Sequence, residues 1–277
     1  MTYRRPRRVG RAARLRRLLV GAVALVAVVA AGVFVAGHTG RVGGSPAPPP
    51  AKVVEVRPGQ TADTVAQTMI TVTGWDESTV AAAFADPAGA GVPAGVTAVE
   101  GWLGPGLYPV APGDTAATLV AQMVAQQLQQ LDALGVPAAA ARQHRTVAQL
   151  VTIASVAQAE AIPSQYGEVA RVITNRLAKG MPLQMDATLN YANGTHVLAH
   201  TSEQLTDKSA YNSYTRHGLP PTPIGNPDDR ALRAAATPPA GNWLYFVLID
   251  KNGTQLFTAD YAEFNRAKAK AQKDGLF

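Results

Sequence analysis

The sequence predicts an α+β protein whose folded part follows an N-terminal membrane-spanning helix. An uncharged stretch runs from Leu18 to Gly37, long enough for such a helix. Helical periodicity is clearest between residues 114 and 180. Strand-like alternation is confined to a short segment at Val53–Val56 and a hairpin pattern that begins at Tyr245. Strands at the two ends with helices between them are typical of the α+β class.

The N-terminus has the charge pattern of a membrane anchor. Eight Arg and no acid lie in residues 1–17. At a rise of 1.5 Å per residue, a helix over 18–37 covers about 30 Å, the thickness of a bilayer's hydrocarbon core. Arginines before the span place the tail in the cytoplasm and the rest outside, which predicts a single-pass plasma membrane protein. A cleaved signal peptide is the alternative, although this apolar run exceeds the usual length of about 7 to 15 residues.

The charge of the chain excludes some functions. It has 25 Lys and Arg against 19 acids, and without the eight Arg of the tail the balance is 17 against 19, or about −2. The basic excess therefore belongs to the tail, and no nucleic-acid partner is expected outside the membrane. The chain has no Cys, which excludes disulfides, thiolate catalysis and Cys-ligated metal.

The segment after the anchor predicts a spacer and a small βα unit. Residues 38–52 are rich in Pro and Gly and form an extended linker. Val53–Val56 alternates as a strand, and Thr61 starts a helix. Farther on, Asp114 is expected to cap a long helix that ends near Gly135.

The C-terminal part predicts a hairpin and a polar helix. Residues 245–249 and 254–257 flank an Asn252-Gly253 turn, and residues 260–273 form the last helix. About 225 residues lie outside the membrane, enough for one main core and a small module.

A helix with a single acid is the most informative element. Thr146 and Gln149 have the spacing of a capping box, and apolar residues then repeat at helical period up to about Ala161. Glu160 falls in line with Ile153 and Val156, on a face that carries apolar side chains. Burial there would raise the pKa of its carboxyl group, which is how a general acid is made. Alternatively, Glu160 pairs with an Arg or caps a backbone group.

Three polar segments follow a second helix, which carries Val169 to Leu177 and ends at Lys179 and Gly180. In the first segment, Gln184, Asp186 and Thr188 alternate along an extended stretch and so face one way. The second adds Tyr211, Asn212 and Tyr214, and the third is a proline-stiffened loop over 218–227. Rings, amides and carboxylates on rigid loops are typical of a sugar-binding cleft.

Each polar segment also has a structural explanation. Asp186 could be a turn or Arg-pairing acid, and the 211–214 segment could lock its loop to the body of the domain. His196 and His200 are four residues apart, but no zinc-type pattern surrounds them. We therefore predict no metal and no cofactor. Neither a serine elbow nor a phosphate loop is present.

The motifs between Glu100 and Asn265 resemble the membrane-bound endolytic murein transglycosylases, the YceG-like or MltG family. The matching motifs, in order, are Glu100-Gly101-Trp102 with Pro105 and Tyr108, Ile153-Ala154-Ser155-Val156 before Glu160, Asn175-Arg176-Leu177 before Gly180-Met181, Leu183-Gln184, Asp186 with Thr188, Tyr211-Asn212-Ser213-Tyr214, Gly218-Leu219-Pro220-Pro221, Pro223-Ile224, Asn226-Pro227 and Tyr245-Phe246-Val247. The resemblance puts the family's catalytic acid on Glu160. This sequence departs from the family pattern at four places. The family has acids at the positions of Gln158 and Gln165, a His at that of Gln255 and often Pro-Asp at that of Pro105-Gly106.

The resemblance implies a LysM-like subdomain over 53–99 and a catalytic domain over 100–277. It also implies a lytic transglycosylase that cleaves the bond between N-acetylmuramic acid and N-acetylglucosamine in nascent peptidoglycan strands. The product would carry a 1,6-anhydro end, and the protein would end strand elongation beside the cell-wall synthases. Gln184, Asp186, Tyr211, Asn212 and Tyr214 are the residues expected to position the glycan.

Two other functions stay open at this point. The departures from the family pattern leave open a catalytically weak scaffold that binds glycan and tethers synthases. A water-using muramidase is the other alternative, and it would need Asp186 close to Glu160 as a second carboxylate.

Overall fold

The computed structural model describes residues 52–195, 197 and 201–277. Residues 51–277 form one compact unit. The predicted tail, transmembrane helix and most of the linker lie outside the described residues. Of the helices in the described part, none is both long and apolar enough to cross a membrane.

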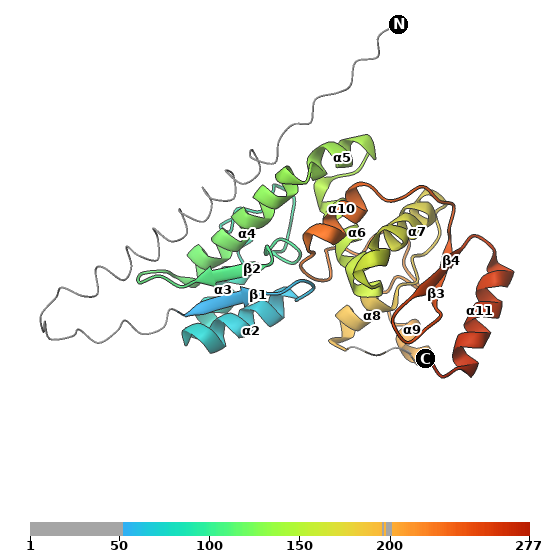
Figure 1. Ribbon diagram of the computed structural model, residues 1–277. Coiled ribbons are helices and arrows are strands. Elements are labelled where there is room, and N and C mark those ends of the chain that lie inside the picture. Colours follow the sequence, from blue (N-terminus) through green and yellow to red (C-terminus); the bar gives the residue numbers. More distant parts are fainter. Residues whose placement is uncertain (1–51, 196, 198–200) are drawn as a thin grey trace, which may run out of the picture. The chain divides into compact units, whose positions relative to one another are not determined.

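An antiparallel pair of strands and two helices form the first module of the described chain (Figure 1). Strand β1 (Val53–Val56) pairs with β2 (Gly106–Pro109) over their whole length. Helices α2 (Ala62–Thr73) and α3 (Glu77–Phe84) lie between them in sequence and pack on each other. The side chain of Thr61 caps α2, as the sequence predicts. The strand pairing crosses the expected boundary at 99/100, so this module extends to Pro109 as a packing unit.

The main core is helical. Helix α4 (Ala116–Ala133) leads through α5 (Val136–Arg142) to α6 (Val147–Glu160), and α7 (Tyr166–Ala178) follows after the short 3-10 turn η1 (Pro163–Gln165). Helix α10 (Asp229–Ala236) packs against both α6 and α7, which lie side by side in Figure 1. Helix α6 is buried from Leu150 to Ala157, which confirms the predicted apolar helix with its Thr146 capping box.

Two local predictions are wrong. The long helix α4 is capped by Thr115, which forms a capping box with Thr118, and not by Asp114. Asp114 instead accepts a hydrogen bond from the backbone N–H of Ala111 in the preceding turn. Both residues are good caps, and the reciprocal bond to Thr118 is available only from Thr115.

The second error concerns the polar stretch after Gly180. Residues 186–193 form helix α8 (Asp186–Asn193), so the predicted alternation of Gln184, Asp186 and Thr188 is absent. Gln184 is exposed with a left-handed backbone (φ 48°), whereas Thr188 is fully buried. The short helix α9 (Ser202–Leu205) follows.

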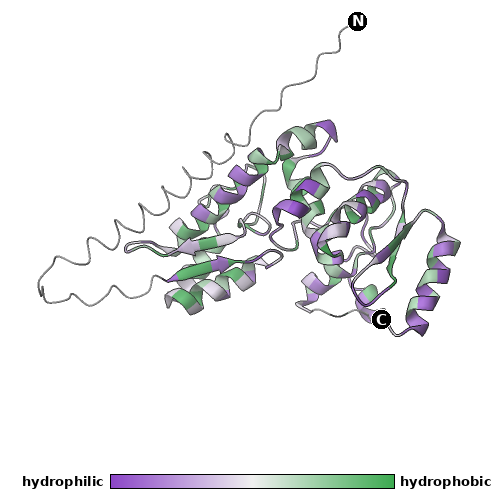
Figure 2. Cartoon of the chain, in the orientation of Figure 1, coloured by the Kyte–Doolittle hydropathy of each residue, from purple (hydrophilic) through white to green (hydrophobic). Residues whose placement is uncertain are grey.

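The C-terminal elements match the prediction. Strands β3 (Tyr245–Leu248) and β4 (Gln255–Thr258) form an antiparallel hairpin. Helix α11 (Tyr261–Lys273), capped by Asp260, packs on this hairpin and is mostly hydrophilic in Figure 2. The hairpin also contacts α7, which brings the C-terminal segment to the end of the helical core.

Candidate active site

Glu160 is the last residue of α6, and its carboxyl group faces the first turn of α8. The carboxylate Oε1 accepts a hydrogen bond of 2.8 Å from the backbone N–H of Ala187. No donor among the described residues bonds to Oε2. One oxygen is thus held by the protein and the other is available for proton transfer.

Burial controls the ionisation of Glu160. Desolvation raises the pKa of its carboxyl group from 4.5 to about 7, as the sequence predicts for an acid on this helix. The hydrogen bond from Ala187 lowers the pKa, the negative charge of Asp186 raises it, and the positive charge of Arg176 lowers it. A carboxyl group with a pKa near 7 can both donate and accept a proton at neutral pH.

Arg176 is a buried cation that sequence reasoning missed. Its Nε donates to the carbonyl of Leu244 at 2.7 Å, and its Nη1 to the carbonyl of Leu183 at 2.6 Å. Its guanidinium group lies 5.6 Å from the centre of the Tyr245 ring. The sequence does indicate this burial, because Arg176 lies at helical spacing on the apolar stripe of Val169, Val172 and Ile173.

Asp186 and Tyr214 meet beside Glu160. Asp186 is the first residue of α8, and its Oδ1 accepts a hydrogen bond of 2.5 Å from the hydroxyl of Tyr214. The charges of both Asp186 and Arg176 act on Glu160. Burial and the bond to Asp186 raise the pKa of the Tyr214 hydroxyl, so Tyr214 stays a neutral donor. The structure therefore brings these two predicted residues together with Glu160.

Asn212 is used within its own loop. It is fully buried, and its Nδ2 donates to the carbonyls of Leu205 and Asp207 at 3.2 and 2.8 Å. Its Oδ1 accepts from the backbone N–H of Tyr214 at 2.9 Å. These contacts match the loop-locking explanation and fix the backbone that carries Tyr214.

The remaining predicted residues lie at the edge of this group. Tyr211 is half-buried, its ring centre lies 4.9 Å from that of Tyr191, and its hydroxyl bonds to Thr222 at 2.8 Å. The exposed side chain of Gln184 makes no hydrogen bond within the described residues, while its backbone N–H donates to the carbonyl of Ser213. The Ser213 hydroxyl accepts from the backbone N–H of Met185, which joins the 211–214 loop to the start of α8.

The side chain of Gln165 bonds to the backbone of Gln255, next to Glu160. Gln165 donates to the carbonyl of Gln255 at 3.1 Å and accepts from its N–H at 2.9 Å. Gln255 then donates from Nε2 to the carbonyl of Glu160 at 2.7 Å. The hairpin therefore holds the end of α6 through neutral amides.

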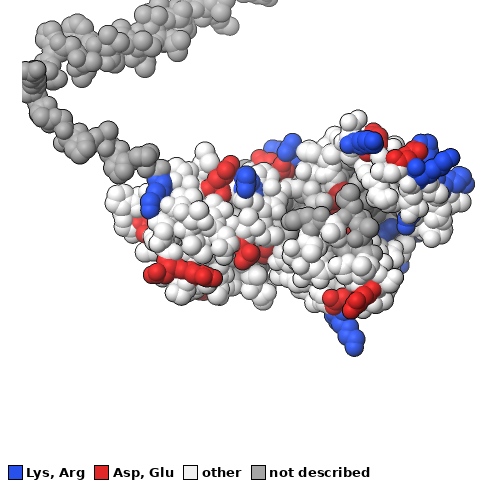
Figure 3. All heavy atoms as spheres, turned by 90° about the horizontal axis from the view of Figure 1, so that it is seen from below, with Lys and Arg blue, Asp and Glu red and all other residues white. Residues whose placement is uncertain are grey.

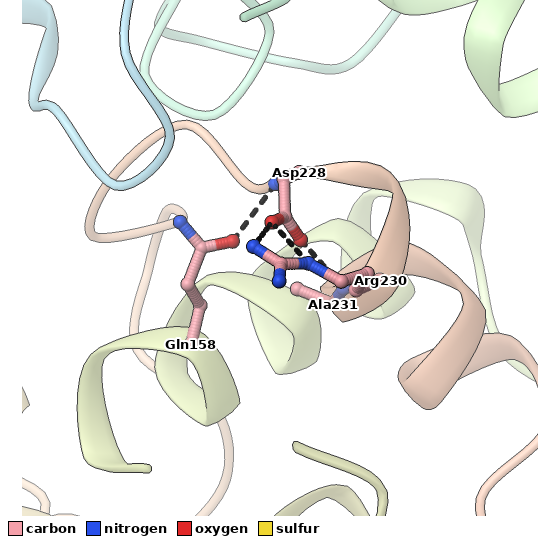
Figure 4. A network of polar contacts seen from close by, with 4 residues as sticks. All are labelled: Gln158, Asp228, Arg230 and Ala231. Carbon is pink, nitrogen blue, oxygen red and sulfur yellow. Dashed lines mark hydrogen bonds and ion pairs between the residues drawn. The ribbon is translucent and has the colours of Figure 1, made fainter. Parts of the chain in front are cut away.

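Gln158 holds a different loop. Its Oε1 accepts from the backbone N–H of Asp228 at 2.8 Å, and Asp228 caps α10 and pairs with Arg230 at 2.8 Å (Figure 4). The departures from the family pattern thus keep structural roles around Glu160.

A second buried acid, Glu100, was not singled out as a site residue. It is 5% exposed and accepts from the backbone N–H of Ala62, at the start of α2, with both oxygens at 3.0 and 3.1 Å. The hydroxyl of Tyr191, on α8, donates to its Oε2 at 3.0 Å. Burial raises the pKa of Glu100 to about 7. The sequence feature that indicates a buried acid here is the position of Glu100 as the one charged residue in the mostly apolar run 96–103.

Among the described residues, neither a metal-binding cluster nor a hollow marks the position of Glu160. On the face shown in Figure 3, acidic and basic groups occur in small separate clusters among neutral atoms. No cluster of three His, Asp or Glu able to hold a metal occurs in residues 52–195, 197 and 201–277; His196 and His200 lie outside them. Two hollows flank α10, and Glu160 lines neither. The chemistry of the acid, and not the size of a cavity, therefore marks the candidate site.

This fold and this acid define a member of the YceG-like class. The model of the YceG-like family matches residues 41–270, and the chain belongs to that family. A solved structure of a YceG-like protein from Listeria monocytogenes superimposes with a TM-score of 0.70 at 27% identity, over 78% of this chain and 75% of that one.

Two relatives named for an activity each match more than half of this chain. An endolytic murein transglycosylase of Bacillus subtilis (strain 168) is 34% identical over 174 residues, which are 62% of this chain and 48% of that protein. The endolytic murein transglycosylase of Streptococcus pneumoniae serotype 2 (strain D39 / NCTC 7466) is 26% identical over 178 residues, 62% of this chain and 32% of that protein. The chain therefore spans about half or less of the length of these relatives.

Proposed function

We propose that this protein is an endolytic peptidoglycan lytic transglycosylase with Glu160 as its single acid and base. The observation that carries the proposal is the carboxyl group of Glu160, whose pKa burial raises to about 7 at the end of an apolar helix. Family membership and the names of the relatives support the choice of murein as the substrate.

The reaction needs only one carboxyl group. Protonated Glu160 gives its proton to the oxygen between N-acetylmuramic acid and N-acetylglucosamine, and the C1–O bond breaks with oxocarbenium-like charge on the muramyl ring. The ionised Glu160 then takes the proton from the C6 hydroxyl of the same ring, whose oxygen bonds to C1. The products are a 1,6-anhydro end and a free 4-hydroxyl group, and no water is consumed.

The neighbouring residues have separate roles in this proposal. Ala187 holds one oxygen of Glu160, and Tyr214 with Asp186 faces the glycan, with Gln184 and Tyr211 farther along the bound strand. Asn212 acts through the backbone of Tyr214 because its own amide is occupied. Arg176 holds the carbonyl groups of Leu183 and Leu244 near Glu160, and its positive charge lowers the pKa of Glu160.

The wider organisation is also a proposal. Residues 18–37 would anchor the protein in the plasma membrane, with the folded part outside, beside the cell-wall synthases. Residues 53–99 would form a LysM-like subdomain and 100–277 the catalytic domain, with β2 shared between them by pairing. Asn226 joins the two parts, because its side chain accepts from Leu103 and donates to Gln60 while fully buried.

The contacts around Glu160 favour catalysis over a scaffold role. Gln165 and Gln255 stand where the family has an acid and a His, and they form three hydrogen bonds, the last of which is donated to the carbonyl of Glu160. The departures thus leave the acid held in place.

Mass spectrometry of products from purified sacculi tests the proposal. A lytic transglycosylase releases 1,6-anhydro-muramyl ends, a muramidase releases reducing muramyl ends, and a scaffold releases neither. Full-length protein in detergent should give anhydro ends, and Glu160→Gln should abolish them. Reducing ends from the wild type, or no products at all, would overturn the proposed reaction.

A further inference from the structure

A hollow on the flank of α10, away from Glu160, has the chemistry of an anion site. It has a volume of about 330 Å³ and lies between the end of α5, the middle of α7 and the end of α10. Its polar lining is Arg142, Gln143, Arg145, Arg171, Thr174 and Thr237, and we name it the arginine hollow. No acid lines it. A second hollow of about 410 Å³, lined by Arg230 and Arg233, shares the wall formed by Ala236 and Thr237.

Arg145 is a desolvated cation in need of a partner. Its Nε is buried and has no hydrogen-bond partner, and no ion pair with Arg145 occurs among the described residues. Burial lowers the pKa of its guanidinium group without any acid acting to raise it. A partly buried guanidinium group without a carboxylate is unfavourable by itself, so a bound anion would recover the lost interaction.

Gln143 adds an acceptor to the same hollow. Its Nε2 donates to the carbonyls of Ala235 and Ala236, both at 3.0 Å, which caps the end of α10 and fixes the side chain. Its Oε1 is therefore held in place, and it is buried without a donor. Two side chains that line the hollow, two residues apart, thus carry a buried cationic donor and a buried acceptor without partners.

Arg171 shapes the wall. Its Nε and Nη2 donate to the carbonyls of Pro239 and Pro238, at 2.6 and 2.9 Å, so its geometry is fixed while its positive charge remains. Arg142 is exposed at the rim. The lining thus carries three positive charges, on Arg142, Arg145 and Arg171, and one side-chain carbonyl acceptor without a partner, on Gln143.

We propose that the arginine hollow binds the C-terminal end of a peptide. The carboxylate would accept from Arg145 and Arg142, and the peptide's own last N–H would donate to Oε1 of Gln143. A simple inorganic anion lacks that N–H donor. The source of the peptide rests on the proposed function: murein carries stem peptides with free carboxylates on its muramyl units. Helix α7 would connect the two sites, since it carries Arg171 at the hollow and Arg176 beside Glu160.

Isothermal titration of full-length protein in detergent with N-acetyl-D-alanyl-D-alanine tests the site. We expect saturable binding that weakens at least about tenfold when the C-terminal carboxylate is amidated. Acetate and inorganic phosphate serve as anion probes. Equal or tighter binding of either one than of the dipeptide would overturn the assignment to a peptide end.

Arg145→Gln should weaken dipeptide binding at least about tenfold, whereas Arg266→Gln on the exposed face of α11 should leave it unchanged. Because loss of Arg145 could disturb folding, Thr237→Glu provides a second variant. Its carboxylate would enter from the exposed wall, occupy Arg145 and abolish binding without lowering the melting temperature. Normal binding by folded Arg145→Gln or Thr237→Glu protein would overturn the inference.

Glycan cleavage and dipeptide binding are measured on the same protein preparation, so the peptide site and the proposed reaction are tested separately. Anhydro ends from sacculi without dipeptide binding overturn only the peptide site. Dipeptide binding that depends on Arg145 without product formation overturns only the proposed reaction.

Discussion

Glu160 and Glu100 are two buried acids with different hydrogen-bond surroundings. Burial raises the pKa of each to about 7, and each bonds to helix α8, through the N–H of Ala187 and the hydroxyl of Tyr191. Glu100 is 5% exposed and both of its oxygens accept hydrogen bonds, whereas Oε2 of Glu160 has no donor among the described residues. A raised pKa therefore marks a candidate acid only when one oxygen is left for a substrate.

The largest expected difference between variants of the two acids is in the turnover of glycan. Glu160→Gln should reduce glycan cleavage by about 10²- to 10⁴-fold, because the amide of Gln cannot give or take the proton that the carboxyl group transfers. The amide oxygen can still accept from Ala187, so the variant should fold. Glu100→Gln is the matched control and should keep turnover within about threefold of wild type. A folded Glu160→Gln protein with more than about a tenth of normal turnover would contradict the assignment.

The pH dependence of stability should reveal Glu100. Its pKa is raised on folding, so its contribution to stability is complete below about pH 4.5 and is lost as the pH rises through about 7. The rise of the pKa from 4.5 to about 7 corresponds to at most about 3.4 kcal/mol. Glu100→Gln removes this loss, so its unfolding free energy relative to wild type should be higher at pH 8 than at pH 5. Denaturant unfolding at both pH values measures this, and parallel pH profiles would show that Glu100 is ionised without penalty.

The charge of Asp186 should shift the pKa of Glu160, but Asp186 should not act as the catalytic acid or base itself. The negative charge of Asp186 raises that pKa, so Asp186→Asn should shift the fall in kcat/KM, expected near pH 7 in the wild type, to lower pH. The amide oxygen of Asn can still accept from Tyr214. A water-using muramidase predicts a different result, because Asp186 would be its base and turnover would fall at least about a hundredfold. A pH–rate profile of the variant decides between them.

The smallest expected effects concern two tyrosine hydroxyls. Tyr191→Phe removes the bond to Glu100 and should cost about 1 kcal/mol of stability while the pH–rate profile stays unchanged. Tyr214→Phe removes the bond to Asp186 and should lower turnover more than it lowers the melting temperature. A shift of the pH–rate profile in Tyr191→Phe would show that the two acids are coupled through α8.

The sequence by itself determined the elements whose signals are local. The Thr146 capping box and the Thr61 cap depend on contacts within a few residues, and the structure has both. The predicted hairpin turn is also present, but Lys251 and Asn252 form it and Gly253 follows with a φ of 88°. The apolar stripe of α6 likewise predicted that burial raises the pKa of Glu160. Even locally, two adjacent cap residues left the choice between Asp114 and Thr115 undecided.

The tertiary structure alone decided what surrounds the acid. Residues 186–193 become helical in a fold where Glu160 accepts from Ala187 and Ser213 binds Met185, contacts 27 and 28 residues apart in sequence. Asn212 is buried, since the groups that its side-chain amide bonds to lie on its own folded loop. Sequence periodicity reports which face of an element is apolar. It does not report which distant groups meet that face, and those groups set the hydrogen bonds and charges around Glu160.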